Sequence, residues 1–422
     1  MQKVNISLAL LSALSSAISF GSYLLLFWYF GPHIQLDSLF RASAGPTAIG
    51  GIVSAVFLAA IPTTLTGKSS AVQNQFIGET SVKVWAWSCV GMAGLLGAMF
   101  CGGFSLTCWM ALVYIPTSAM FLMSTLTSAL HQARGAFLHS LVPSILTSTG
   151  LAAGCVLAVA LNNVWWVPLL HLSGAALPVE WRRTVLPAFR KFKLIDSLLR
   201  WHRKQKKGLL HALHVLAATL PFTLFQPMDA ILSSQMPVGA LSILTLSQRI
   251  LVAYGTIISV GVCTTAAFRS HGLLLDGGEA AVKRDAFRKA IEICGLGLFG
   301  AFGFWCIRDS CMNEFARVAG KSATGTTELF HVVGIMLLGC GPMAAMPFLV
   351  RISYRLNNYI IPAILGGLIP LTYLSLGLWI VGIFGLLGIA WIYVALWWAS
   401  LVLFLVWIHL SSPCTLSSEI MP

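Results

Sequence analysis

An acid and a base stand inside apolar stretches of this sequence, where a charge is costly. Asp229 lies near the end of the apolar run 209–232, and Arg249 lies within the next run, 241–268. A charge inside a membrane span costs about 3 kcal/mol or more unless it is paired or faces a wet cavity. In adjacent helices the two depths differ by roughly 7 Å, which long side chains can bridge. The pattern indicates either a structural ion pair or a cavity in which Arg249 receives an anionic group.

Two further pairs of charged residues, each spaced four apart, lie at the ends of apolar runs. Asp37 and Arg41 precede the second run, and Arg351 with Arg355 ends the tenth. Residues four apart share one face of a helix, so Asp37 and Arg41 can pair there. Alternatively, they contact a substrate at the outer mouth. Arg351 and Arg355 are predicted to anchor lipid headgroups, or to touch a phosphate at an inner gate.

The motifs of common enzyme classes are missing from the sequence. It has no HExxH or GxSxG motif, and no pair of acids within one apolar run that would favour hydrolysis. Its ten cysteines form no CxxC pair, which argues against a zinc site or a disulfide framework. We therefore expect no catalytic residue, no bound metal and no enzyme activity.

The composition is that of a protein that folds within a lipid bilayer. Of its 422 residues, 57% are hydrophobic and 9% are charged, and the mean hydropathy is +0.85. A soluble domain carries roughly 25% charged residues. Because about 20 apolar residues cross the hydrocarbon core, the sequence predicts an all-α polytopic membrane protein with about twelve transmembrane helices. Their predicted ranges are 6–30, 42–65, 84–102, 106–130, 141–161, 164–179, 209–232, 241–268, 290–307, 327–350, 359–380 and 384–409.

The basic residues predict how these helices are oriented. If the chain starts in the cytoplasm, most of the 26 Lys and Arg residues fall in cytoplasmic segments, as is usual for multi-pass proteins. Both termini are then cytoplasmic, and the net charge of +13 reflects topology and not nucleic-acid binding. The predicted organisation is a six-helix lobe at 1–179, a linker at 180–207, a second six-helix lobe at 208–410 and a cytoplasmic tail at 411–422.

The linker 180–207 is predicted to be a basic amphipathic segment. Its ten bases and two acids surround an apolar stripe with near-helical spacing. Such a segment lies in the membrane interface and attracts anionic lipids, at about 1 kcal/mol per base near the surface. Docking of a partner enzyme, such as a glycosyltransferase or a polymerase, is the alternative role.

Several stretches resemble the MOP superfamily, which includes the flippases of lipid-linked polysaccharide units (the O-antigen and polysaccharide branch) and of lipid II. The first span ends in FG, an acid follows at Asp37, and a Gly- and Pro-containing second span closes on Pro62. The stretch PMDAILSS, the turn PVGALS and the helix LSQRILVAYGTIISVGVCTTAAFRS look like the seventh and eighth helices of the lipid II flippase branch. NNYIIP, after Arg355, is similar to that family's turn before the eleventh helix.

The resemblance implies two six-helix lobes around a central cationic cavity. Alternating access would move an undecaprenyl-diphosphate-linked oligosaccharide from the inner to the outer leaflet. By position, Arg249 matches a cavity arginine of the lipid II branch, Asp229 an acid common in the seventh helix, and Asp37 the acid after the first helix. The first span lacks the basic residues of that branch, and Gly50 and Gly51 stand where its second span tends to have arginines. A glycan other than that of lipid II is therefore expected.

The resemblance further implies a monomer in the bacterial inner membrane that acts in cell-surface polysaccharide or cell-wall synthesis. It would need no cofactor, and a coupling ion (H⁺ or Na⁺) or the membrane potential would drive it. Two alternatives stay open. A cation-coupled multidrug exporter of the same superfamily would line its cavity with acids, for which Asp229 is a candidate. A non-transporting scaffold for glycosyltransferases would depend on the linker 180–207 and not on Arg249.

Overall fold

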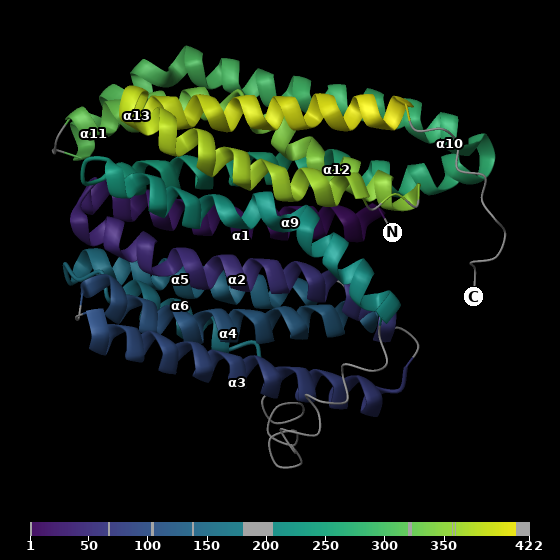
Figure 1. Ribbon diagram of the computed structural model, residues 1–422, viewed down its shortest axis with the longest axis horizontal. Helices are drawn as coiled ribbons and strands as arrows, with labels where there is room; N and C mark the ends of the chain where they lie inside the picture. Colours follow the sequence, from purple (N-terminus) through teal and green to yellow (C-terminus); the bar gives the residue numbers. More distant parts are fainter. Residues whose placement is uncertain are drawn as a thin grey trace.

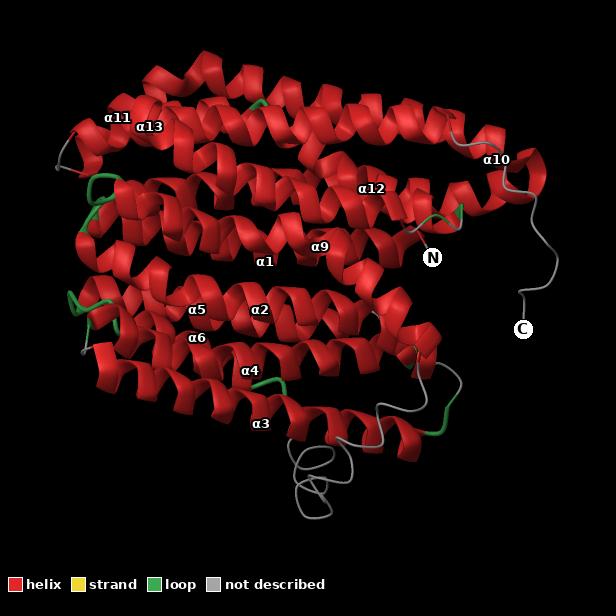
Figure 2. Cartoon of the chain, viewed as in Figure 1, coloured by secondary structure: helices red, strands yellow, loops and turns green. Residues whose placement is uncertain are grey.

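Long helices make up nearly all of the chain that the structure describes. The computed structural model describes residues 2–65, 68–102, 105–136, 139–179, 206–319, 323–356, 358 and 360–410. Within these ranges every regular element is a helix and none is a strand (Figure 2). The first group of helices comprises α1 (Gln2–Phe30), α2 (Ile34–Leu65), α3 (Ser70–Gly102), α4 (Leu106–Ala133), η1 (His139–Leu141), α5 (Val142–Ala160) and α6 (Trp166–Ala176).

The second group follows the linker region and contains two very long elements. Its members are α9 (Lys206–Leu232), η3 (Ser233–Gln235), α10 (Ala240–Ala319), α11 (Ala323–Leu337), α12 (Cys340–Arg355) and α13 (Ile360–Leu410). Helix α10 is interrupted at Gly278 (φ 67°) and α13 at Gly385 (φ 55°). Glycine adopts positive φ at little cost, so each long element can turn back on itself there. Figure 1 shows the two halves of α13 running beside each other.

The helices have the length and composition of membrane spans. By these two criteria, six helices among the described residues can cross a bilayer, and α11 with α12, bent by 43°, makes a seventh. Because α10 and α13 each contain two of the predicted spans, all twelve predicted ranges fall on helices, although α2 begins 8 residues and α3 begins 14 residues before the predicted starts at 42 and 84. The tenth range is broken between α11 and α12. The predicted fold class, an all-α multi-pass membrane protein, is confirmed.

The helices pack as two groups that meet along one seam. Helices α1 to α6 contact one another, as do α9 to α13, and Figure 1 shows the two groups one above the other. We call these groups the N-lobe and the C-lobe. The main contacts between them join α2 to α9, α1 to α10 and α2 to α10, and these four helices form what we call the interlobe seam. The predicted linker 180–207 falls almost wholly outside the described residues, so its boundaries stay a prediction.

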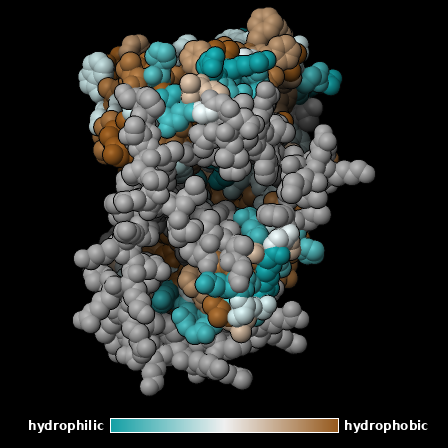
Figure 3. All heavy atoms as spheres, turned by 90° about the vertical axis from the view of Figure 1, so that its right-hand side faces the viewer, coloured by the Kyte–Doolittle hydropathy of each residue, from teal (hydrophilic) through white to brown (hydrophobic). Residues whose placement is uncertain are grey.

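Both ends of the helical chain lie on one side of the bundle. Figure 1 shows the start of α1 and the end of α13 at the same end, together with the turn of α10 at Gly278. Following the predicted charge topology, we call this end the inner end and the opposite one the outer end. Figure 3 looks onto the inner end, where hydrophilic side chains of described residues appear on both lobes.

Some polar side chains on these apolar helices bind side chains of a neighbouring helix, and others bind the backbone of their own helix. The hydroxyl of Ser15 on α1 lies 2.8 Å from that of Ser148 on α5, and Ser19 donates to Ser148 at 2.9 Å. Helix α4 begins after Ser105, whose side chain accepts a hydrogen bond from the backbone N–H of Cys108. Bilayer lipid offers no such partners, so polar contacts of this kind fix which helix faces lie inside the bundle.

Candidate functional site

Asp229 is buried at the outer half of α9 and is held by two other helices of its own lobe. Its side chain is 0% exposed. One carboxylate oxygen accepts a hydrogen bond of 2.5 Å from the hydroxyl of Tyr373 on α13, and the other accepts one of 2.5 Å from the side-chain amide of Gln248 on α10. Hydrogen bonds to a charged group contribute about 1.5–3 kcal/mol each. The hydrogen bonds from these two neutral donors therefore offset part of the free-energy cost of burying this acid.

Aromatic rings enclose the Asp229 site. The ring of Phe225, one turn earlier on α9, stands edge-on to Tyr373 with centroids 4.6 Å apart. Tyr393 and Trp397 of α13 complete the cluster, and Trp397 is 0% exposed. These rings exclude water and fix the position of the Tyr373 hydroxyl. The buried carboxylate of Asp229 thus links α9 to α10 and α13 through hydrogen bonds.

Arg249 points away from this site and across the interlobe seam. Its guanidinium carbon lies 4.9 Å from the ring centroid of Tyr23 on α1, in a cation–π contact. Tyr23 is 8% exposed and packs on Phe40 of α2. Such a contact contributes about 0.5–2 kcal/mol. Within the part of the chain that the structure describes, none of the guanidinium N–H groups is used in a hydrogen bond or an ion pair.

The ion pair between Asp229 and Arg249, one of the two alternatives that the sequence left open, is not formed. The physical reason is the helical repeat: successive residues point about 100° apart around the axis. Gln248 faces α9 and binds Asp229, so its neighbour Arg249 faces α1 instead. The structure therefore leaves a cation at the junction of the lobes, with its hydrogen-bond donors unused by described residues.

Asp37 joins the two lobes at the outer end of the seam. Its carboxylate on α2 accepts hydrogen bonds from the backbone N–H of Gly239 at 2.7 Å and of Ser242 at 2.9 Å, and from the Ser242 hydroxyl. These donors lie at the start of α10, in its first turn and in the residue before it, where an acid is favoured by the unpaired N–H groups and the helix dipole. Asp37 is only 8% exposed. The acid thus caps a helix of the opposite lobe.

The predicted pair of Asp37 with Arg41 is also wrong, because a helix of the other lobe occupies the carboxylate of Asp37. Both oxygens of Asp37 are engaged by α10, and Arg41 is exposed, with no ion pair among the described residues. A contact between residues 205 positions apart replaces the local one. Spacing along one helix predicts which residues share a face, but not which other helix covers that face.

Uncharged polar residues continue the seam inward from Asp37. Gln226 of α9 donates to the Ser43 hydroxyl at 3.2 Å and accepts from the Thr47 hydroxyl at 3.3 Å. At the outermost turn, Gly239 (φ 99°) lies against Pro32, and a Cβ at this glycine would come within 2.5 Å of the proline Cβ. The outer half of the seam is therefore closed by neutral and acid-to-backbone contacts.

The remaining predicted residues lie at the inner end. Arg351 is exposed in the last part of α12, and the side chain of Arg355 lies outside the described residues. The structure does not bring Arg351 together with Asp229, Asp37 or Arg249. In the described ranges, no group of three His, Cys, Asp or Glu residues lies close enough to hold a metal ion.

Sequence reasoning missed the neutral partners that define the site. Gln248, Tyr373, Ser242 and Gln226 all bind a predicted acid or bridge the lobes. One usable signal was present: Gln226 precedes Asp229 by three residues, a spacing that places both on neighbouring faces of one helix. Tyr373 lies in a distant apolar span, and nothing in its own surroundings marks it as a partner of Asp229.

Comparisons with known proteins agree with the fold. No family model and no curated protein matches the sequence. A solved structure of the lipid II flippase MurJ in an inward closed conformation aligns over 96% of this chain and 87% of its own, with a TM-score of 0.75 and 15% identity. A MOP superfamily transporter from Pyrococcus furiosus aligns over 96% and 95%, with a TM-score of 0.63 and 13% identity. An inward-facing multidrug resistance transporter of the MATE family, also of the MOP superfamily, aligns over 94% and 97%, with a TM-score of 0.60 and 13% identity.

These likenesses extend over nearly the whole chain and identify its architecture. The chain has the fold of the MOP superfamily transporters, as the resemblance in the sequence predicted. Within that superfamily the neighbours include both a lipid flippase and multidrug transporters, so the fold leaves the substrate open.

Proposed function

We propose that the protein is an alternating-access flippase that moves an undecaprenyl-diphosphate-linked oligosaccharide from the inner to the outer leaflet. The observation that carries the proposal is the position of Arg249. This cation lies at the seam between the lobes, stacked on Tyr23, and no described residue accepts a hydrogen bond from it. A planar guanidinium can donate two parallel hydrogen bonds to phosphate oxygens, so a diphosphate suits it.

The interlobe seam supports a mechanism in which the lobes move as bodies. Asp229, Gln248 and Tyr373 bind one another within the C-lobe, and such contacts persist when the lobe rotates. Contacts of Asp37 and Gln226 cross between lobes and must break for the outer side to open. The closed outer half corresponds to a state that would load substrate from the inner leaflet.

The site of action follows from the same proposal. Such a flippase would lie in the bacterial inner membrane as a monomer and serve cell-surface polysaccharide or cell-wall synthesis. It performs no bond chemistry, and an ion gradient or the membrane potential would drive the cycle. The linker 180–207 would contact anionic lipids, or the glycosyltransferase or polymerase that supplies or consumes the glycan.

One observation favours a second candidate, a cation-coupled multidrug exporter. Asp229 is a fully buried acid within the C-lobe, and a buried carboxylate is the kind of group to which a coupling cation binds. Against this, both of its oxygens already accept hydrogen bonds from Tyr373 and Gln248. A cation there would have to displace or share these donors, which makes the flippase the better-supported function.

Transbilayer movement in vesicles tests the proposal. The purified protein is reconstituted with a fluorescent undecaprenyl-diphosphate oligosaccharide, and the arrival of the probe in the opposite leaflet is measured for the parent, Arg249→Ala and Arg249→Lys. We expect Ala to abolish movement and Lys to restore part of it, because a point charge attracts the diphosphate without the bidentate geometry.

A matched control separates loss of the Arg249 cation at the interlobe seam from loss of any arginine on the same helix. Arg308→Ala removes another α10 arginine that also stacks on an aromatic ring, with its guanidinium carbon 4.5 Å from the centroid of Trp305. It lies near the outer end of α10, away from the seam, and should move the probe as the parent does. If Arg249→Ala also matches the parent, the cationic seam is not the substrate site. If the parent itself moves nothing, the exporter and scaffold functions replace the flippase.

A further inference from the structure

The inner end of the second half of α10 combines exposed bases with an exposed apolar stripe. Phe287 is 52% exposed and Ile291 56%, and the same helix continues with Leu298, Phe299 and Phe302 at 40%, 75% and 69%. Positions separated by three, four and seven residues lie on one helix face. An apolar face this exposed on a membrane-spanning helix is covered by lipid acyl chains.

Two arginines extend this lipid-facing stripe beyond the hydrocarbon. Arg284 and Arg288 are exposed, and they precede Ile291 by seven and three residues, respectively, on the same stripe. Arg284 therefore lies about 10 Å further toward the inner end along the helix axis than Ile291. Long basic side chains at such a boundary keep their stems on apolar surface and their charged groups in the headgroup layer.

The acids of this segment are less exposed than two of its arginines. Between Gly278 and Glu292 the three acids, Glu279, Asp285 and Glu292, are all partly buried. Arg284 and Arg288 are the exposed charged residues there. The most exposed charges of the segment are thus cationic, although the segment as a whole carries nearly balanced charge.

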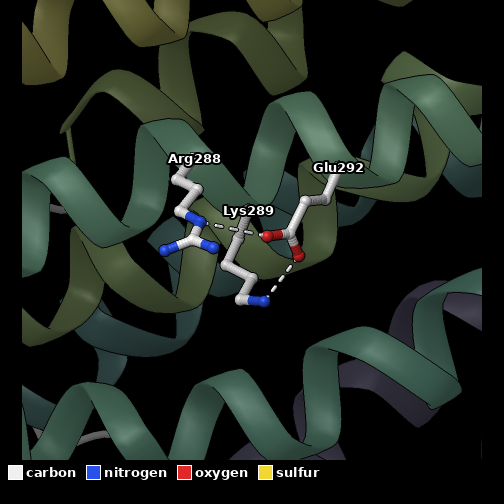
Figure 4. Close-up of polar contacts among 3 residues, drawn as sticks. All are labelled: Arg288, Lys289 and Glu292. Atoms are coloured by element: carbon white, nitrogen blue, oxygen red, sulfur yellow. Dashed lines mark hydrogen bonds and ion pairs between the residues drawn. The ribbon is translucent and has the colours of Figure 1, made fainter.

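Glu292 forms ion pairs with Lys289 and, at a longer distance, with one of these arginines. Its carboxylate binds the ammonium of Lys289 at 2.5 Å and the Nε of Arg288 at 3.3 Å, and Figure 4 shows both side chains reaching toward it. The contact to Arg288 uses only the Nε side of the guanidinium. Its two terminal nitrogens have no acidic partner among the described residues, and the side chain is 76% exposed.

We propose that Arg284 and Arg288 bind the phosphate of an anionic phospholipid in the inner leaflet, with its acyl chains packed on Phe287 and Ile291. The phosphate matches the two guanidinium groups in charge, and each can offer it paired N–H donors. This contact does not depend on what the protein transports, and it is separate from the predicted lipid contact of the linker 180–207.

The outer end of the same helix segment provides a natural contrast. Arg308 is engaged by Asp309, with nitrogen and oxygen 2.8 Å apart, and stacks on Trp305. Its charge is thus neutralised within the protein. Phe302, 15 residues after Phe287, lies on the same apolar stripe but has no arginine one turn away. Phe302 is therefore a matched lipid-facing reference position.

Site-specific photocrosslinking tests the proposal. p-Benzoylphenylalanine replaces Phe287 or, in the reference protein, Phe302, and the full chain is reconstituted in vesicles of equal phosphatidylglycerol and phosphatidylcholine. After irradiation, mass spectrometry gives the ratio of the two lipid adducts within each sample, which is independent of expression level. We expect phosphatidylglycerol to be enriched roughly 25-fold at position 287 relative to position 302, since each of the two arginines contributes about fivefold at the surface.

Removal of the arginines completes the test. In the Phe287 probe protein, Arg284→Gln with Arg288→Gln should bring the adduct ratio down to that at position 302, whereas Arg308→Gln should leave it unchanged. Equal ratios at the two probe positions would overturn the proposal. So would an enrichment that survives loss of both arginines, or a probe at position 287 that crosslinks no lipid while the one at 302 does.

Discussion

Two buried acids, Asp229 and Asp37, receive their hydrogen bonds from different lobes of the protein. Each is almost inaccessible and accepts hydrogen bonds from neutral donors, without an ion pair among the described residues. The donors to Asp229 come from its own lobe, whereas those to Asp37 come from the N-terminal end of a helix in the other lobe. The first acid therefore stabilises a lobe, and the second stabilises one arrangement of the two lobes. A buried acid can thus stabilise the fold of one lobe or one conformation of the whole protein, depending on which lobe supplies its hydrogen-bond donors.

Removal of the Asp37 carboxylate should have the largest effect and should act on the lobe arrangement. Asp37→Ala deletes hydrogen bonds to Gly239 and Ser242, so the closed outer seam should lose about 3 kcal/mol, more than a hundredfold in the ratio of closed to open states. Spin labels at exposed Gln35 and Ser234 would report longer distances in pulsed electron resonance. Arg41→Ala, four residues away, should leave the distances as in the parent. An unchanged distribution in Asp37→Ala would refute the role of the acid as an interlobe contact.

Substitution of the other acid should weaken the fold and not the seam. Asp229→Asn keeps the shape but directs an amide N–H₂ at one of two donors, Tyr373 or Gln248, and should cost about 2 kcal/mol of stability. Thermal unfolding in detergent would show a lower Tm, while the distance between labels at 35 and 234 stays as in the parent. Asp309→Asn, at an exposed acid, is the control. A longer distance between the labels at 35 and 234 in Asp229→Asn would contradict the claim that only Asp37 controls the lobe arrangement.

A smaller effect should follow from removing one donor at a time. Tyr373→Phe deletes the hydroxyl that binds Asp229 but retains the ring that packs edge-on against Phe225. The expected loss is about 1 kcal/mol of stability, less than for Asp229→Asn, because the Gln248 hydrogen bond remains. Thermal unfolding of both variants and of the double variant measures this. If the double variant loses the sum of the two single effects, the residues do not interact and the hydrogen bond is unimportant.

Much of the fold was predictable because the length of an apolar run in the sequence directly indicates a membrane span. All twelve ranges fall on helices, and the runs that share α10 or α13 are separated at Gly278 and near Gly385. The break between α11 and α12 was not predicted, since Leu338 and Gly339 continue an apolar run without a polar interruption. Apolarity predicts where a span lies, but not whether its backbone is straight.

The candidate site was only partly predictable. Asp229, Arg249 and Asp37 stand out because charges in apolar runs are costly, and the structure gives each a specific environment. Their partners could not be derived from spacing. The choice of Gln248 over Arg249 as partner of Asp229 depends on the rotation of α10 about its axis, which tertiary packing decides. The cap formed by Asp37 on α10 depends on how two lobes meet.

The most direct test of the central claim is whether the seam cation binds the diphosphate. Binding of undecaprenyl diphosphate to the detergent-solubilised protein would be titrated by native mass spectrometry for the parent, Arg249→Gln and Arg308→Gln. Two charged hydrogen bonds predict that Arg249→Gln binds at least tenfold more weakly, while Arg308→Gln binds as the parent does. Equal binding by the parent and Arg249→Gln would contradict the account, and Arg249 would then be a packing contact of Tyr23.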